Sequence, residues 1–245
     1  WGFTWQRERS FRIAISDRKL VGAAAALLFV NQLCFVSSVH LTNASTVALM
    51  LGATPIFAGI IASLVGIEQL RAGFWIAALL ALAGVGCVAG GGLSGDVVGD
   101  TLAVGTAATW AAYSVAIVPL MRRYSPLRIS TLVFAVAWLP LALVSIPDLL
   151  AQGYSTVSWT LAVSFVYAVV GPLFLTNILW FTAISRVGAS RATLFTTIQP
   201  LFAVLFAVVL LSEHLNGWEI AGGAAIGVGI VVERLCGQRP LAAGE

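Results

Sequence analysis

The chain has 245 residues, of which 60% are hydrophobic and 9% are charged. Soluble domains carry about 25% charged residues. The composition therefore excludes a soluble globular protein, which could not hide so much apolar surface. The net charge of +3 is spread over short segments between apolar stretches. It forms no basic stripe on a soluble face, so we expect no nucleic-acid partner.

Eight apolar stretches follow one another along the chain, with charged residues almost absent from their interiors. Most have about the 20 residues that a helix needs to cross a bilayer, at about 1.5 Å rise per residue. They are Leu20–Val39, Ala44–Gly66, Gly73–Gly91, Thr101–Met121, Ile129–Pro147, Ser158–Ile184, Ala192–Leu211 and Trp218–Cys236. We therefore expect an all-α, polytopic protein with eight transmembrane helices, whose surroundings are the lipid bilayer.

The basic residues alternate with the expected spans. All thirteen Lys and Arg residues fall in segments that can share one side of the membrane. These are Arg7, Arg9, Arg12, Arg18, Lys19, Arg71, Arg122, Arg123, Arg128, Arg186, Arg191, Arg234 and Arg239. The loops on the other side hold His40, Asp96, Asp100, Asp148 and Glu213 but no Lys or Arg. Because positively charged loops stay in the cytoplasm, we expect an inner-membrane protein with both ends of this chain cytoplasmic.

The chain contains an internal repeat. Residues 43–88 align with residues 188–233 without a gap, and ten pairs are identical. The informative pairs share rare residues in fixed register: Pro55/Pro200, Phe57/Phe202 and Glu68/Glu213. Five expected spans separate corresponding points, an odd number, so the two copies must be inverted in the membrane. Inverted repeats are common in secondary transporters, which bind substrate near the midplane.

The repeat also predicts helices that precede this chain. The second repeat, residues 99–236, holds five expected spans. The first, residues 1–92, holds only the counterparts of the third to fifth. We therefore expect a ten-helix protein, truncated here at its N-terminus, with two inverted five-helix repeats.

These motifs resemble the EamA-like branch of the drug/metabolite transporter superfamily. Residues 99–102 (Gly-Asp-Thr-Leu) and 107–114 (Ala-Ala-Thr-Trp-Ala-Ala-Tyr-Ser) resemble the opening helix of an EamA unit. The Ala-Ser pairs at 44–45 and 189–190 resemble the start of its fourth helix. The resemblance covers nearly the whole chain.

The same fourth helix has a central proline and a closing glutamate, which Pro55, Pro200, Glu68 and Glu213 match in this chain. The family's glycine before that glutamate is here isoleucine or serine. The resemblance implies ten-helix carriers that move small metabolites by alternating access, and it favours export. It names no substrate.

Catalytic and metal-binding signals are missing from the sequence. The three cysteines lie in or beside spans without metal spacing, and both histidines lie at span ends. An enzyme needs a cluster of ionisable groups, and the span interiors offer none. We therefore expect no enzyme activity, no metal and no cofactor. A non-transporting receptor or membrane subunit, or a channel, remains the alternative to a carrier.

Candidate substrate-binding residues are the polar and aromatic side chains inside the spans. They are Asn31, Gln32, Thr54, Trp110, Tyr113, Asn177, Trp180 and Gln199. Buried amides in a bilayer need partners from protein, water or substrate. These polar side chains can equally form hydrogen bonds between helices, and Trp110 and Tyr113 can simply pack against a neighbouring helix. The interiors hold neither Lys or Arg for a phosphate nor Asp or Glu for a strong cation. We therefore expect a small neutral or zwitterionic, amino-acid-like substrate.

Candidate gating positions are the residues that interrupt or end spans. Pro55, Pro200 and the Gly171-Pro172 pair should bend their helices. Glu68 and Glu213 could cap the N-terminus of the helix that follows them, or form a gate contact in one transport state. Small residues in 73–91 and 218–236 allow close helix approach. We read these two spans as scaffold helices or as the interface of a possible homodimer.

Overall fold

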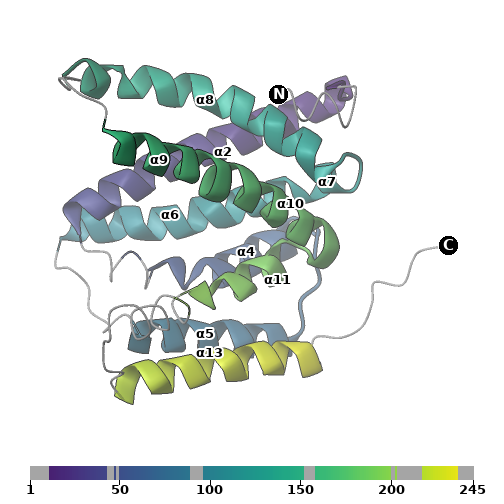
Figure 1. Ribbon diagram of the computed structural model, residues 1–245. Coiled ribbons are helices and arrows are strands. Elements are labelled where there is room, and N and C mark those ends of the chain that lie inside the picture. The colour runs from purple at the N-terminus through teal and green to yellow at the C-terminus, as the bar shows by residue number, and fades with distance from the viewer. Residues whose placement is uncertain are drawn as a thin grey trace. The chain divides into compact units, whose positions relative to one another are not determined.

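The structure is a computed structural model that describes residues 11–42, 47, 50–88, 96–151, 158–199, 202 and 217–236 (Figure 1). Within those residues the chain is helical and has no strand. It divides into two compact units. Unit 1 comprises residues 1–29 and 116–188, and unit 2 comprises residues 30–115 and 189–245. Each unit thus contains stretches from both expected repeats.

The helices carry the labels of Figure 1. In chain order they are α2 (Ile15–Leu41), α4 (Thr54–Leu64), α5 (Ala72–Val88), α6 (Val97–Ala116), α7 (Val118–Met121), α8 (Pro126–Ala151), α9 (Trp159–Ala168), the π-helix η1 (Val169–Leu175), α10 (Thr176–Val187), α11 (Ala189–Thr196) and α13 (Gly217–Cys236).

Four helical stretches of the described chain are long and apolar enough to cross a membrane: Ile15–Leu41, Val97–Met121, Pro126–Pro147 and Trp159–Val187. They coincide, within a few residues, with the first, fourth, fifth and sixth expected spans. Helices α5 and α13 match the third and eighth. Within the second span the structure describes α4 and a few helical residues before it, and the seventh runs mostly outside the described residues. The all-α, multi-pass membrane class is confirmed, whereas the count of eight stays a prediction.

Helices α5 and α13 of unit 2 lie side by side (Figure 1). A Cβ atom added to Gly84 would lie 2.6 Å from the carbonyl oxygen of Gly222, and one added to Gly229 would lie 2.9 Å from that of Ala77. Only glycine allows the two backbones to approach so closely. This contact between small residues replaces the hydrophobic effect, which gives no net attraction between helices in lipid.

The distribution of small and large side chains around α5 follows from the same close approach of α5 and α13. Its buried face carries mainly small residues, including Ala77, Ala78 and Ala81, whereas the larger Ile76 and Leu79 are exposed. A water-soluble helix would show the reverse arrangement. The small residues that we expected to form a scaffold or a dimer interface therefore pack within the chain, and the large apolar side chains face outward.

Unit 1 contains the start of α2 and the helices from α7 to α10. Helix α10 packs against α7 and α8 and buries Phe181 and Ile184. The long sixth span is not one regular α-helix, because the π-helix Val169–Leu175 separates α9 from α10. Gly188, which follows α10, has a φ of 86°. This left-handed conformation suits glycine and ends the helix before α11 begins.

Candidate functional site

Two helices of unit 2 are interrupted at matching positions. Before α4, residues 52 and 53 form a turn, and the amide of Ala53 donates to the carbonyl oxygen of Met50 at 3.0 Å. After α11, residues 197 and 198 form a turn, and the amide of Ile198 donates to that of Phe195 at 3.2 Å. The two bonds are related residue by residue through the 145-residue offset of the repeat. The same four-residue turn thus replaces α-helical geometry in both copies.

Pro55 lies in the first turn of α4, where proline is tolerated because that amide has no helical partner. The regular helix is interrupted at residues 52 and 53, just before Pro55, and the Thr54 hydroxyl donates to the Leu51 carbonyl oxygen that Pro55 cannot reach as a donor. The bend expected at Pro55 stays a prediction. The N-cap residue Ala53 offers no side-chain hydrogen bond to the first turn. At this start the amides of Ala53 and Ile56 already donate to the carbonyl oxygens of Met50 and Ala53, each at 3.0 Å. Pro200, the repeat counterpart of Pro55, lies outside the described residues.

The two interruptions place their polar side chains differently. Thr54 is buried, and its hydroxyl donates to the carbonyl oxygen of Leu51 at 2.6 Å. Gln199 occupies the equivalent position in the second copy and is exposed. Its amide makes no hydrogen bond within the described part of the chain. A bare amide facing hydrocarbon is costly, so Gln199 needs water, protein or substrate beside it.

Asn31 joins α2 to α6 in unit 2. Its Nδ2 group donates to the carbonyl oxygen of Thr106 at 2.8 Å and to Oγ1 of Thr109 at 3.2 Å. The Nε2 group of Gln32 donates to the side-chain Oδ1 atom of Asn31 at 3.5 Å. Asn31 is only 3% exposed. Because the Asn31 amide donates both hydrogen bonds to α6, its geometry is that of a structural contact between α2 and α6.

The aromatic candidates of α6 contact each other. The ring centroids of Trp110 and Tyr113 are 5.4 Å apart, with the planes tilted by 47°. Tyr113 is fully buried and Trp110 is partly buried. The pair therefore forms one aromatic surface on the side of α6 that also carries the Asn31 contact.

The remaining candidates belong to unit 1. Asn177 and Trp180 lie in α10 and are partly buried. Gly171 and Pro172 lie inside the π-helix that precedes it, where the hydroxyl of Thr176 reaches back to the carbonyl oxygen of Gly171 at 3.3 Å. The expected interruption of this span is present, in the form of a wider helical turn. π-Helical turns of this kind are frequent at functional sites.

Glu68 caps a helix, but not the one that we expected. Its Oε1 atom accepts hydrogen bonds from the amides of Ala189, at 2.7 Å, and Ser190, at 3.5 Å. These amides open α11, whereas the helix that follows Glu68 in sequence is α5. A carboxylate at a helix N-terminus satisfies free donors and is attracted by the helix dipole. The contact joins the α4–α5 loop to the start of the second interrupted helix. Its repeat counterpart, Glu213, lies outside the described residues.

A second carboxylate holds the same turn of α11. Arg191 donates from Nε to Oε1 of Glu233, which is buried near the end of α13, at 2.7 Å. The start of α11 is thus tied both to the α4–α5 loop and to the α5/α13 pair. Glu233 was not among the residues predicted from the sequence. Its position on the small-residue face of an apolar helix indicates that the carboxylate needs a cationic partner.

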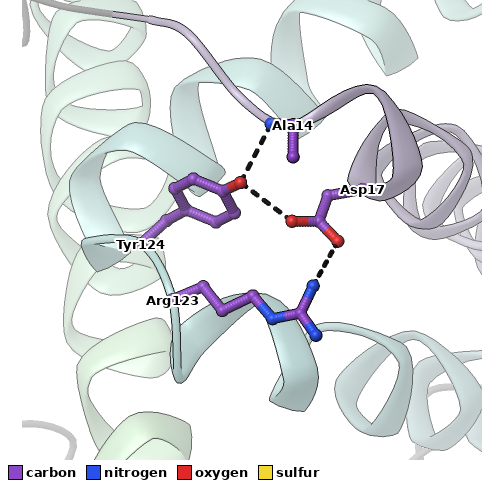
Figure 2. A network of polar contacts seen from close by, with 4 residues as sticks. All are labelled: Ala14, Asp17, Arg123 and Tyr124. Atoms are coloured by element: carbon purple, nitrogen blue, oxygen red, sulfur yellow. Dashed lines mark hydrogen bonds and ion pairs between the residues drawn. The ribbon is translucent and has the colours of Figure 1, made fainter.

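Unit 1 contains a comparable cluster, which Figure 2 shows. Asp17, in the first turn of α2, accepts from Arg123 Nη1 at 2.7 Å and from the Tyr124 hydroxyl at 2.8 Å. The Tyr124 oxygen in turn accepts from the amide of Ala14 at 3.0 Å. Asp17 is 2% exposed. Asp17 was not among the residues predicted from the sequence, although an acidic residue beside Arg18 in a basic segment was a clue.

Comparisons with known proteins agree with this architecture. A solved structure, described as a crystal structure of a protein, matches with a TM-score of 0.81 at 20% identity, covering 97% of this chain and 83% of its own. At that identity the likeness establishes the fold alone. No curated protein matched the chain. The EamA-like transporter family matches residues 2–90 and 97–233, nearly the whole sequence. The chain therefore belongs to the EamA-like transporter family and is a membrane transporter of the drug/metabolite type.

Proposed function

We propose that this transporter exports a small, neutral or zwitterionic, amino-acid-like metabolite across the inner membrane by alternating access. The observation that carries the proposal is the pair of matched interruptions, at residues 52–53 and 197–198. Broken helices are a recurrent way for carriers to offer backbone donors and acceptors to a substrate in the membrane. The repeats, residues 1–92 and 99–236, would then supply one interruption each.

The substrate class follows from the charges. In the described spans, the ionisable side chains near the interruptions, Glu68, Arg191 and Glu233, are engaged at helix ends. A phosphorylated or strongly cationic substrate would lack a counter-charge, and an unpaired charge within the membrane is costly. A zwitterion can instead place its carboxylate at a helix N-terminus and its ammonium group against carbonyl oxygens or an aromatic face.

The candidate site combines residues with distinct roles. Gln199 and Thr54 flank the interruptions and are proposed as direct ligands. Trp110 would offer an aromatic face, with the buried Tyr113 packed against it. Asn31 is proposed to hold α2 against α6, leaving Gln32 as the amide beside it. Within unit 1, Asn177 and Trp180 are proposed as further substrate ligands, and the π-helix before them as a bending point.

Alternating access requires contacts that form in one state and break in the other. We assign this role to the hydrogen bonds of Glu68 to Ala189 and Ser190. They join the loop after one interrupted helix to the start of the other. Rearrangement of either helix at its turn would change the distance between these groups. The contact is therefore proposed to close one end of the transport pathway.

Transport by the full-length protein in proteoliposomes tests the substrate class. Saturable uptake of a labelled neutral amino acid should be competed by other small zwitterions, and not by sugar phosphates or organic cations. Gln199→Ala and Asn177→Ala should weaken that competition. Strong competition by a phosphorylated sugar, undiminished in both variants, would contradict both the substrate class and the site.

The proposed orientation has a separate test. Single cysteines at Arg186 and at His40, in a background without the three native cysteines, should differ in labelling by a membrane-impermeant thiol reagent in intact cells. Both positions are exposed. His40→Cys should be labelled and Arg186→Cys protected, because basic loops stay cytoplasmic. The reverse pattern would overturn the orientation.

A further inference from the structure

The start of α11 is held by two carboxylates from different parts of unit 2. Glu68, half-buried in the α4–α5 loop, accepts from the backbone amides of Ala189 and Ser190. Glu233 of α13 accepts from Arg191 Nε at 2.7 Å, and its side chain is 8% exposed. The first contact joins a loop to a helix end, whereas the second joins two helices. The two contacts therefore differ in how easily they can break.

Glu233 belongs to the face of α13 that packs against α5. Four residues spaced by four, three and four positions share this side of the helix: Gly222, Ile226, Gly229 and Glu233. A Cβ atom on Gly229 would lie 2.9 Å from the carbonyl oxygen of Ala77, and Ile226 is fully buried. Because the two backbones are in contact, this face has little room to shift. The Glu233 carboxylate is therefore held in a fixed place relative to α5.

Breaking the two contacts has unequal costs. When the Arg191–Glu233 pair separates, a buried carboxylate loses its cation, which is among the most costly single changes in a protein. When Glu68 withdraws, two amides at a helix start lose an acceptor, which costs much less. The difference corresponds to a factor of roughly 100 in the equilibrium constant. A rearrangement of unit 2 should therefore release Glu68 and keep Arg191 beside Glu233.

The internal repeat separates the two contacts in the same way. The loop glutamate is present in both copies of the repeat. The positions equivalent to Arg191 and Glu233 are Thr46 and Val88, neither of which carries a charge. The sequence thus provides the ion pair for the span that contains α11 and not for the span that contains α4. The two interrupted spans should therefore not move alike.

We propose that the Arg191–Glu233 pair is the pivot of α11 during transport, intact in every state, while the Glu68 contact opens and closes. Both members of the pair are then positioning residues, because they hold the start of α11 against α13 and act without contacting substrate. The inference rests on the alternating access proposed above. It adds that α11 is fixed at its start, so that a change at the turn of residues 197–198 moves the part of the span that follows, beginning with Gln199.

Crosslinking in the full-length protein without its native cysteines tests the pivot, with transport measured in proteoliposomes. Arg191→Cys/Glu233→Cys removes both charges together, so the protein should stay folded, but the start of α11 is released. We expect transport to fall about tenfold, within the range by which residues outside a binding site alter coupled equilibria. A thiol-specific crosslinker between the two cysteines should restore transport, and cleavage of the link should lower it again. A role in stability alone would give no such gain.

Two further variants remove the dependence on the cysteine pair. Arg191→Met/Glu233→Met is a second neutral pair and should show the same loss of transport. Arg191→Lys keeps the ion pair and should retain transport. Normal transport in either neutral pair, or loss of transport when positions 191 and 233 are linked, would overturn the pivot.

The matched comparison is Glu68→Cys/Ala189→Cys, treated with the same reagent. Linking this pair should abolish transport, the opposite of the response at positions 191 and 233. Undiminished transport with positions 68 and 189 linked would contradict the proposed gate, whereas the response of the other pair decides the pivot. The failure of one proposal is therefore distinguishable from the failure of the other.

Discussion

Unit 2 contains two pairs of helices from the repeated segments, and the pairs differ sharply. Helices α5 and α13 are repeat counterparts, whereas α4 and α11 are opposite parts of two corresponding spans. Helices α5 and α13 run uninterrupted and meet through glycine and alanine at backbone contact distance. Helices α4 and α11 are short, because each ends or begins at a turn at residues 52–53 or 197–198. Both pairs lie in the same apolar surroundings. The difference therefore arises from local sequence: small residues in one pair, proline and polar residues in the other.

In the proposed mechanism, α5 and α13 act as a scaffold and α4 and α11 as the parts that move. A helix pair packed backbone to backbone has few alternative arrangements, because close-packed interfaces do not deform continuously. An interrupted helix can instead change its backbone at the turn with little loss of hydrogen bonds elsewhere. The carboxylates of Glu68 and Glu233 connect the two regions at the start of α11. In the proposed alternating-access mechanism, the α5/α13 pair would be the fixed reference against which α4 and α11 rearrange.

The largest expected effect falls on the scaffold. Gly84→Ala places a Cβ atom 2.6 Å from the carbonyl oxygen of Gly222 and 2.7 Å from Ile226 Cγ1, so the helices must separate. We expect a loss of about 2–3 kcal/mol in unfolding free energy, measured in detergent, since overpacking costs this much. Gly227→Ala, on α13 with nothing within 4 Å, is the matched control. Equal stability of the two variants would refute the tight α5/α13 contact.

Removal of the side-chain amides of Gln199 and Asn31 should have opposite effects on transport and on stability. Gln199→Ala should lower transport about tenfold, the value of one lost polar contact of roughly 1.4 kcal/mol, with unchanged unfolding. Asn31→Ala should instead lower stability by about 1 kcal/mol, because it removes hydrogen bonds between helices. Paired transport and unfolding measurements distinguish them. A stability loss in Gln199→Ala without a transport defect would mean that the interruption is only structural.

The smallest expected effect concerns Glu68, which caps the start of α11. Glu68→Ala should lower stability by about 0.5–1 kcal/mol, because two amides at the start of α11 lose their acceptor. Glu68→Gln should restore most of that loss, since its amide oxygen still accepts. Unfolding in detergent measures both. If the glutamine variant were as unstable as the alanine variant, the charge rather than the acceptor would be essential.

Much of the fold could be predicted from sequence, because the bilayer makes hydropathy and length decisive. The expected spans at residues 20–39 and 218–236 agree with α2 and α13 within a few residues. The repeat also pointed to Pro55 and Pro200 as special positions. What it could not reveal was the form of the interruption. A proline accommodates either a kink within a helix or the first turn of a new one.

The partners of side chains were harder to predict. Glu68 was expected to cap the helix next in sequence, but it caps α11, which begins 121 residues later. Hydropathy fixes the order of helices along the chain and not which ends are adjacent in space. The same limit hid the contact of Asp17 with Arg123. Asn31 shows that a polar residue inside a span can be satisfied by a neighbouring helix, so its residue type alone does not mark a ligand.

Reversible crosslinking of the proposed gate tests the central claim most directly. In a background without native cysteines, Glu68→Cys/Ala189→Cys would be joined by a short thiol-specific crosslinker, and transport measured in proteoliposomes before crosslinking and after cleavage of the link. Glu68→Cys alone, treated identically, is the control. If α4 and α11 rearrange during transport, crosslinking should abolish uptake and cleavage should restore it. Undiminished transport with the link verified intact would contradict the account.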